Sequence, residues 1–169
     1  MTLEGSPGHA WPVNDFHLAQ VNVGRILAPL DSPQLADFVA QLPEINALAD
    51  HAPGFVWRMV DDEGADATGL RPEDEDDLLL FNCSVWESVD ALKAYVYRSD
   101  HLRVMARRRE WFERLADHHM ALWWVPAGHR PGVAEAMDRV ALLRAKGSTP
   151  DAFTFRAPHP PPTGNADRP

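Results

Sequence analysis

The sequence contains a single cysteine, Cys83, and no long apolar run among its 169 residues. A lone cysteine excludes an internal disulfide and cannot by itself form a metal cluster. A bilayer-spanning helix needs about 20 consecutive apolar residues, and the N-terminus also lacks the apolar core of a signal peptide. We therefore expect a cytoplasmic protein without a membrane partner.

Positive charge is also scarce. The sequence has 16 Lys and Arg residues against 25 Asp and Glu residues, which gives a formal net charge of −9. Non-specific nucleic-acid binding needs a basic footprint, so no nucleic-acid partner is expected. The charge is uneven, because residues 61–77 hold nine of the 25 carboxylates and residues 98–114 are basic. A charged run with Gly and Pro is typical of a solvated loop, so the acidic segment is given no catalytic role.

The motifs of the common nucleotide and cofactor enzymes are missing. The sequence has no glycine-rich phosphate loop, no dinucleotide fingerprint and no nucleophile elbow. His51, His118 and His119 do not form a metal-binding set, because a helical zinc pair needs His residues at i and i+4 and a third ligand. We therefore predict no metal, and ATP, NAD and serine-hydrolase chemistry lack support.

Alternation of apolar residues predicts strands at residues 16–26, 55–60, 78–86 and 120–125, and a short edge strand is compatible with residues 152–155. Helical stripes begin near Pro33, Ser88, Asp100 and Pro131, and Pro43 is expected to kink or split the first helix. Ser88, and Ser99 or Asp100, are the expected caps of the middle two helices.

Composition divides the chain into three parts. Residues 1–15 are predicted to be a flexible N-terminal segment, residues 16–156 a single domain and residues 157–169 a disordered Pro-rich tail. The order strand, helix, strand, strand, helix pair, strand is typical of a ferredoxin-like α+β fold, with an antiparallel sheet and helices on one face. The other face would then be bare and aromatic, and two such sheets would close a dimeric α+β barrel. A homodimer through the open sheet face is therefore expected.

One helical stripe carries two polar residues. His101, Met105, Arg108 and Phe112 step by four and three and therefore share one helix face. His101 is a candidate general base, haem ligand or hydrogen-bond donor, or else a packed histidine bonded to a backbone carbonyl. Arg108 is a candidate for bidentate binding of a substrate carboxylate or phenolate. The alternatives are a structural ion pair, or a stem that packs along the core with its charged head outside.

Amides occupy strand positions where apolar residues would be expected. Gln20 and Asn22 continue the strand face begun by Phe16 and Leu18, and Asn82 and Ser84 form a similar face on another strand. If the two faces coincide, the amides line one cavity and could hold an enolate or peroxide oxygen. The alternative is a closed network of paired amides.

Aromatic side chains could form flat walls for a ligand. Among the six tryptophans, those predicted to contact a ligand are Trp57, Trp86, Trp111 and Trp123. Bulk in the core or in a dimer interface is the alternative for each of them. Cys83, opposite in parity to Asn82, is predicted to pack as a small apolar residue.

Four stretches resemble the DUF3291 family: HLAQVNVGRILAPLDSP, INALADHAPGFVWRM, LLLFNCSVWESVDALKAYVYRSDHLRVMARRREWF and LWWVPAGHRPGVAEAMDRVALLRAKGSTPDAFTF. They cover nearly all of residues 17–155. Members of that family have no assigned general function. The family is similar to the dimeric α+β barrel superfamily, which includes antibiotic-biosynthesis and haem-degrading monooxygenases. The segment LADHHM at 115–120 departs from the usual family pattern, and fold does not fix function.

The resemblance implies three functional hypotheses. The first is a small-molecule enzyme similar to cofactor-free monooxygenases, or a related cyclase or isomerase, acting on an acidic aromatic or polyketide-like substrate. His101 or an amide would assist deprotonation, Arg108 and Asn22 would stabilise the anion, and no cofactor would be needed. The second is a haem-binding or haem-handling protein with His101 as axial ligand. The third is a non-catalytic dimeric module that binds a small molecule.

Overall fold

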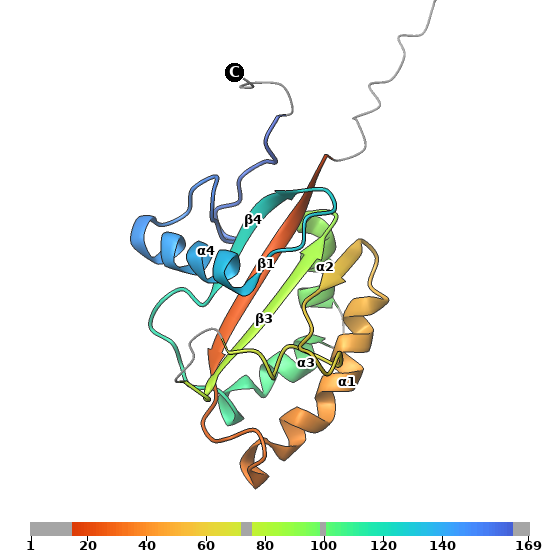
Figure 1. The fold of residues 1–169 in the computed structure, drawn as a ribbon, viewed down its shortest axis with the longest axis vertical. Helices are drawn as coiled ribbons and strands as arrows, with labels where there is room; N and C mark the ends of the chain where they lie inside the picture. The colour runs from red at the N-terminus through yellow and green to blue at the C-terminus, as the bar shows by residue number, and fades with distance from the viewer. Residues whose placement is uncertain (1–14, 72–75, 99–100, 164–169) are drawn as a thin grey trace, which may run out of the picture.

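The computed structural model describes residues 15–71, 76–98 and 101–163. Its centre is an open, four-stranded antiparallel sheet of order β2-β3-β1-β4 (Figure 1). The strands are β1 (Phe16–Arg25), β2 (Phe55–Arg58), β3 (Leu79–Trp86) and β4 (Met120–Pro126). This order, with the first and third strands paired at the centre, confirms the predicted ferredoxin-like α+β fold.

The described residues also form four α-helices and two 3-10 turns, of which all but the last helix lie between strands. They are η1 (Pro33–Leu35), α1 (Ala36–Asp50), α2 (Val89–Arg98), α3 (His101–Ala106), η2 (Arg108–Glu110) and α4 (Val133–Lys146). Ser88 caps α2 as predicted, because its hydroxyl accepts the backbone N–H of Ala91 at 3.1 Å. Pro43 lies inside α1, which continues from Ala36 to Asp50, so the predicted split does not occur. Ser99 and Asp100, the expected caps of the next helix, lie outside the described residues.

The helix that begins at His101 is shorter than predicted. It ends at Ala106 and gives way to η2, whereas the periodicity extended it to Leu115. The cause is tertiary pairing with the chain that follows β1. The backbone N–H of Leu27 donates to Trp111 and that of Glu113 donates to Arg25, each at 2.8 Å. An extended segment at 111–113 is incompatible with a helix, so the sheet edge overrides the local periodicity.

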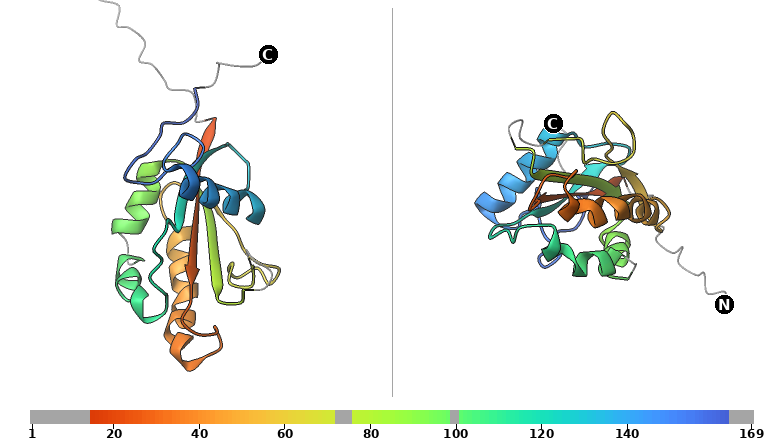
Figure 2. Two further views of the ribbon diagram at one scale, coloured as in Figure 1. Left: turned by 90° about the vertical axis from the view of Figure 1, so that its left-hand side faces the viewer. Right: turned by 90° about the horizontal axis from the view of Figure 1, so that it is seen from below.

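The sheet has two buried faces. The α4 face consists of Ala19, Val21, Val23, Phe81, Cys83, Val85, Ala121, Trp123 and Val125, which pack against α4 and against a segment that includes Ala67 and Leu70. Figure 2 shows α4 on one side of the sheet and α2 and α3 on the other. The prediction that all helices lie on one face and leave the other bare is therefore corrected. Even Trp123 on the α4 face is only 1% exposed within one chain.

The opposite face is called here the cavity face, and it holds the even-numbered residues of β1, β3 and β4. One apolar cluster at one end contains Leu18, Trp86, Leu92, Leu122 and Phe153. A second cluster at the other end contains Ile26, Leu35, Leu80 and Trp111. The polar residues Gln20, Asn22, Asn82 and Ser84 lie between these clusters, since Gln20 pairs with Ser84 and Asn22 with Asn82.

The C-terminal segment returns to the sheet. Phe153 forms an isolated antiparallel bridge with Leu122 of β4. The Trp124 indole N–H donates to the backbone carbonyl of His159 at 2.8 Å. The tail expected to be disordered begins at residue 157. The bond from Trp124 to His159 holds the first part of this tail against β4. The expected flexible segment at 1–14 lies outside the described residues, and no helix in the described ranges is long and apolar enough to cross a bilayer.

Candidate functional site

A cavity of about 390 Å³ lies between the cavity face of the sheet and helices α1, α2 and α3. Its volume is within the range of about 300–1,000 Å³ that is usual for small-molecule sites. Most of the wall is apolar, with Phe38, Leu42, Val104 and Phe112 among its residues. Polar side chains reach this wall from the sheet, from the helices and from the loop after β2, and several of them are informative about the ligand.

The floor of the cavity is a hydrogen-bonded polar patch. The amide nitrogen of Gln20 donates to Asn82 Oδ1 at 2.8 Å and to Ser84 Oγ at 3.1 Å. The Trp86 indole N–H also donates to Ser84 Oγ, at 2.8 Å. Gln20 and Ser84 are buried, and these bonds offset the cost of removing them from water. The network fixes the orientation of Gln20 and of the Trp86 ring.

Asn22 differs from its neighbours in this patch. Its Oδ1 atom is buried and accepts no hydrogen bond from the described part of the chain. An unsatisfied buried acceptor costs about 1–3 kcal/mol. Because Asn22 lines the cavity, a donor on a bound molecule would satisfy the amide. This observation favours a ligand site over the alternative of a closed amide network.

Arg108 is the charged group of greatest interest in the wall. Its guanidinium carbon lies 4.7 Å from the centroid of the Phe112 ring. Within residues 15–71, 76–98 and 101–163, no carboxylate forms a salt bridge with it. Burial lowers the pKa of the Arg108 guanidinium, with no neighbouring anion to oppose the effect. The structural alternative for Arg108, an ion pair inside the protein, is therefore not observed.

The preceding residue shows the contrast. Arg107 bonds to Glu110 at 2.8 Å and to Asp37 of α1 at 3.2 Å, and its side chain is partly exposed. Arg107 thus ties η2 to α1, whereas Arg108 turns to the cavity. Gly24 of β1 permits this position, because a Cβ there would lie 2.7 Å from the Phe112 ring and 3.2 Å from Arg108 Nη2.

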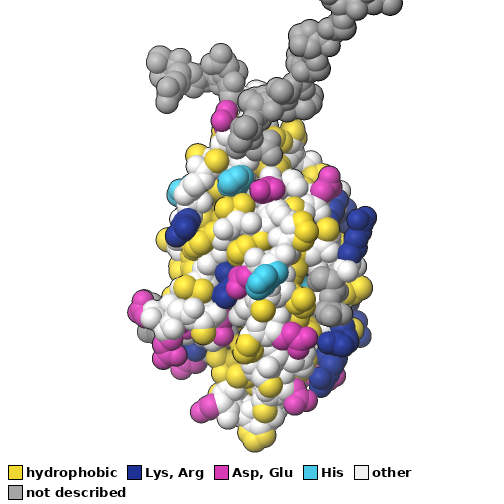
Figure 3. Space-filling model, turned by 90° about the vertical axis from the view of Figure 1, so that its right-hand side faces the viewer, with side chains coloured by type: hydrophobic (Ala, Val, Ile, Leu, Met, Phe, Trp, Pro, Cys, Tyr) yellow, Lys and Arg dark blue, Asp and Glu magenta, His cyan; other side chains and the backbone are white. Residues whose placement is uncertain are grey.

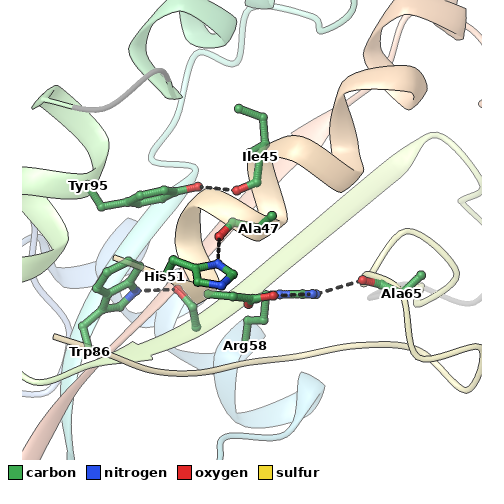
Figure 4. Close-up of polar contacts among 9 residues, drawn as sticks. Ile45, Ala47, His51, Arg58, Ala65, Trp86 and Tyr95 are labelled. Carbon is green, nitrogen blue, oxygen red and sulfur yellow. Dashed lines mark hydrogen bonds and ion pairs between the residues drawn. The ribbon is translucent and has the colours of Figure 1, made fainter. Parts of the chain in front are cut away.

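His101 lies toward the other end of the cavity, in a row of aromatic rings. The Trp86 and Tyr95 rings stack with centroids 5.1 Å apart, and the Tyr95 and His101 centroids are 4.8 Å apart. Burial lowers the pKa of His101, and a hydrogen bond to the backbone of Val96 opposes this effect. The Tyr95 hydroxyl donates to the Ile45 carbonyl of α1 at 3.3 Å (Figure 4), and burial raises its pKa to about 12.

The structure brings together most of the predicted site residues. Those that line the cavity are His101, Arg108, Asn22, Gln20, Asn82, Ser84, Trp86 and Trp111. Trp57 and Trp123 do not, because both lie on the α4 face. Trp57 pairs with Val85 after a β-bulge that separates it from Phe55, so the two aromatic residues point to opposite faces. Trp123 pairs with Ala19 and its indole N–H donates to Glu135 of α4 at 3.0 Å.

Several polar residues that line the cavity have no role in the prediction from sequence. Among them are Tyr95, Arg58 and His119. Arg58 is held by Asp50 at 2.7 Å and by the Ala65 carbonyl at 2.9 Å, so it is already paired (Figure 4). His119 could have been noticed from the sequence, since it immediately precedes a strand whose first residue, Met120, pairs with Asn22.

The surface charge is also organised. Figure 3 shows Lys and Arg side chains gathered along one edge of the molecule, with Asp and Glu mostly elsewhere. Exposed cations on the α3 side include Arg103 and Arg109. Such charges can attract an anionic ligand toward the protein. No group of three or more His, Cys, Asp or Glu side chains that could hold a metal occurs within the described residues.

Fold and cavity together define a ferredoxin-like α+β protein with a ligand-sized cavity between its sheet and its helices. The chain belongs to the family described as "Domain of unknown function (DUF3291)", whose model matches residues 17–168. No curated protein has a sequence that matches this chain.

Several solved structures are similar to this one at low sequence identity. One is SnoaB from Streptomyces nogalater, described as a cofactor-independent oxygenase, at 18% identity and a TM-score of 0.45, over 68% of this chain and 95% of SnoaB. A second is a protein of unknown function, NE2512, from Nitrosomonas europaea, at 14% identity and a TM-score of 0.42, over 70% of this chain and 97% of that one. A third is a putative antibiotic biosynthesis monooxygenase from Chloroflexus aurantiacus, at 15% identity and a TM-score of 0.38, over 70% of this chain and 99% of that one.

Proposed function

We propose that this protein is a small-molecule enzyme of the cofactor-independent oxygenase type, acting on an acidic aromatic substrate in the cavity. The observation that carries the proposal is Arg108, a half-buried cation in a mostly apolar wall with no carboxylate partner among the described residues. Removing a cation from water is unfavourable unless an anion compensates. A bound substrate anion would supply that compensation.

Size and shape support an aromatic substrate. A cavity of about 390 Å³ has room for a molecule of two or three fused rings. The Trp86 and Tyr95 rings offer a flat wall at one end, and Arg108 offers two parallel N–H donors at the other. The substrate would therefore place its rings near Trp86 and its anionic oxygen near Arg108.

The polar patch would orient the substrate. Gln20 is held in place before the substrate arrives, because Asn82 and Ser84 already accept its amide N–H groups. Asn22 Oδ1 is a buried acceptor without a bond from the described residues, so it would accept a hydrogen bond from a substrate hydroxyl. Charge that develops on the substrate would be stabilised by Arg108, the cation of the wall.

The chemistry needs only the substrate and dioxygen. Loss of a proton from an activated CH₂ group gives a stabilised carbanion, which reduces dioxygen and forms a new C–O bond. Loss of water then leaves a ketone, so that R₂CH₂ + O₂ gives R₂C=O + H₂O. The substrate carbon supplies the electrons for the reduction of dioxygen. Residues of the chain would orient the anion, exclude water and accept the first proton.

The test uses an acidic hydroxyanthrone, 1,8-dihydroxyanthrone, with an oxygen electrode and mass spectrometry of the product. We expect oxygen uptake above the uncatalysed rate and a product heavier by one oxygen and lighter by two hydrogens. Arg108→Gln should lower kcat/KM by about tenfold to a hundredfold, the loss of one charge-assisted contact. The exposed neighbour provides the control variant, Arg109→Gln, which should behave as wild type.

If the anthrone binds with Arg108 dependence but is never turned over, the protein is a binding module and the catalytic part of the proposal is wrong. If neither binding nor turnover depends on Arg108, the whole proposal fails. These two outcomes can be distinguished, because binding is measured by tryptophan fluorescence before oxygen uptake is followed.

A second candidate function is haem binding through His101. It is favoured by the hydrogen bond between His101 and the backbone of Val96, an arrangement that commonly orients a metal-binding imidazole. A haemin titration of wild type and His101→Ala tests it. A saturable Soret shift with one haem per chain, absent from the variant, would support haem, and a shift that the variant retains would contradict it.

A homodimer belongs to the same proposal, since a closed barrel needs a second sheet. Its original support, an exposed aromatic face, is absent because α4 covers that face within one chain. Sedimentation equilibrium at micromolar concentration decides the matter. A dimer mass supports barrel closure, and a monomer mass contradicts it.

A further inference from the structure

We propose that His119 is the general base of this site and removes the substrate proton next to Arg108. The inference rests on the proposed function, because it assumes that an acidic substrate occupies the cavity. It assigns the proton transfer to a histidine that sequence reasoning passed over, in place of His101.

The position of His119 is fixed by the sheet. Its backbone carbonyl accepts the Val23 N–H at 2.8 Å, immediately before Met120 pairs with Asn22. The half-buried His119 lines the same cavity as Asn22 and Arg108. Asn22 and Gly24 are successive residues of the cavity face, about 7 Å apart along the strand. Since Arg108 Nη2 lies beside Gly24, the amide, the guanidinium and the imidazole gather at one end of the cavity.

The His119 ring has the state that a base requires. The backbone of Asp117 accepts a hydrogen bond from the ring, which assigns the proton to one nitrogen and leaves the lone pair of the other available. Burial and then Arg108 lower the pKa of His119 below its ordinary value of 6.5, with smaller contributions in the same direction from His118 and from Arg144 of α4. The imidazole is therefore neutral at pH 7.

His101 is less suited to the same role. It lies against Tyr95, with ring centroids 4.8 Å apart, and is bonded to the backbone of Val96 in the preceding helix, α2. Tyr95 in turn stacks on Trp86, whose indole is held by Ser84. This row of rings forms the aromatic end of the cavity, away from the cation that would stabilise the anion. We therefore assign His101 a role in shaping the ring pocket.

The proton transfer balances within these groups. The C–H bond of the substrate breaks, its electron pair stays on carbon as an enolate and the proton joins the free nitrogen of His119. Arg108 pairs with the enolate oxygen, and the resulting substrate anion offsets the repulsion between Arg108 and the new imidazolium. After reaction with dioxygen, the imidazolium returns the proton to the departing hydroxide, which leaves as water.

The sequence itself provides a matched control, because His118 is exposed and adjacent to His119. We would measure kcat/KM against pH for wild type, His119→Gln and His118→Gln. Wild type should show an acid limb with an apparent pKa below 6.5, since only the neutral imidazole accepts a proton. His119→Gln should lose at least about a hundredfold in kcat with little change in KM, and it should lose the acid limb. His118→Gln should retain both.

A second measurement does not depend on turnover. The His119 pKa is followed by NMR in wild type and in Arg108→Gln, each with and without 2-naphthoate. Removing Arg108 should raise the His119 pKa, and so should binding of the naphthoate anion to wild type. If His119→Gln keeps kcat and the acid limb while Arg108→Gln still abolishes naphthoate binding, the base assignment is wrong and the anion site stands. If Arg108→Gln binds naphthoate as tightly as wild type does, the proposed function itself fails.

Discussion

The guanidinium of Arg108 lies 4.7 Å from the centre of the Phe112 ring, and both groups occupy the space above Gly24 of β1. An aromatic face attracts a cation but does not neutralise it. The pair therefore holds a charge at the wall of the cavity and leaves its hydrogen-bond donors available to a ligand. The central claim, an anion site at Arg108, depends on this relationship.

Gly24→Ala should disturb the site without removing its charge. The new Cβ would lie 2.7 Å from the Phe112 ring, closer than packing allows, so Phe112 and Arg108 must move. We expect a stability loss of about 1–3 kcal/mol and weaker binding of 2-naphthoate by calorimetry. Gly132→Ala is the control, because nothing lies within 4 Å of its added Cβ. Unchanged naphthoate affinity in Gly24→Ala would show that Arg108 does not need this position.

Ser84→Ala should destabilise the polar patch. Ser84 Oγ accepts both the Trp86 indole N–H and a Gln20 amide N–H, so its loss leaves buried donors unsatisfied. The free energy of unfolding, measured with urea, should fall by about 1–3 kcal/mol. Asn82→Ala removes only one exposed acceptor of Gln20 and should cost less. Equal costs for the two variants would mean that the Trp86 bond contributes little.

Cys83 should be chemically silent in the folded protein. Its side chain is 1% exposed, and burial raises its pKa to about 12, with a smaller effect of Glu135. Because the thiolate is the reactive form, Ellman's reagent at pH 8 should label Cys83 only at the rate of unfolding. Labelling should become rapid in urea above the transition. Immediate labelling in buffer would contradict the burial of β3 against α4.

Stability should decrease as the pH is lowered through the titration of two histidines. Burial lowers the pKa values of both His101 and His119 below 6.5 in the folded protein, so the unfolded chain binds protons at a higher pH. The free energy of unfolding should be constant above pH 6.5 and fall below it. His119→Gln should reduce that slope, whereas His118→Gln should not. Chemical denaturation at pH 7.5, 6.5 and 5.5 measures the difference, and identical slopes in all three proteins would contradict it.

The sequence was sufficient to predict the strands, their order and the polar patch. Alternation in β1 and β3 placed Gln20, Asn22, Asn82 and Ser84 on faces that the register then aligned. The helical stripe correctly brought His101 and Arg108 to the same cavity, although the helix ends at Ala106. The stripe remained useful because η2, which contains Arg108, begins two residues after α3 ends.

What the sequence did not predict depends on interactions between distant segments. The bulge between Phe55 and Trp57 places these two residues on opposite faces of the sheet, and no local sequence pattern predicts it. The predicted ligand contact Trp123 lies on the α4 face because of how β4 pairs with β1, which places Trp123 opposite Ala19. Helix α4 packs against the second face of the sheet, a tertiary contact that no local pattern predicts. Because of this contact, the sheet does not expose the aromatic surface that was expected. His119 entered the site for the same reason, since its position depends on pairing next to Met120.

The most direct test of the anion site is isothermal titration calorimetry of 2-naphthoate and of its neutral amide with wild type, Arg108→Gln and Arg109→Gln. We predict that wild type and Arg109→Gln bind the acid at least about tenfold more tightly than the amide, a difference of about 1.4 kcal/mol. Arg108→Gln should bind the two compounds equally and weakly. If Arg108→Gln retains the wild-type preference for the acid, Arg108 does not bind the substrate anion and the account is contradicted.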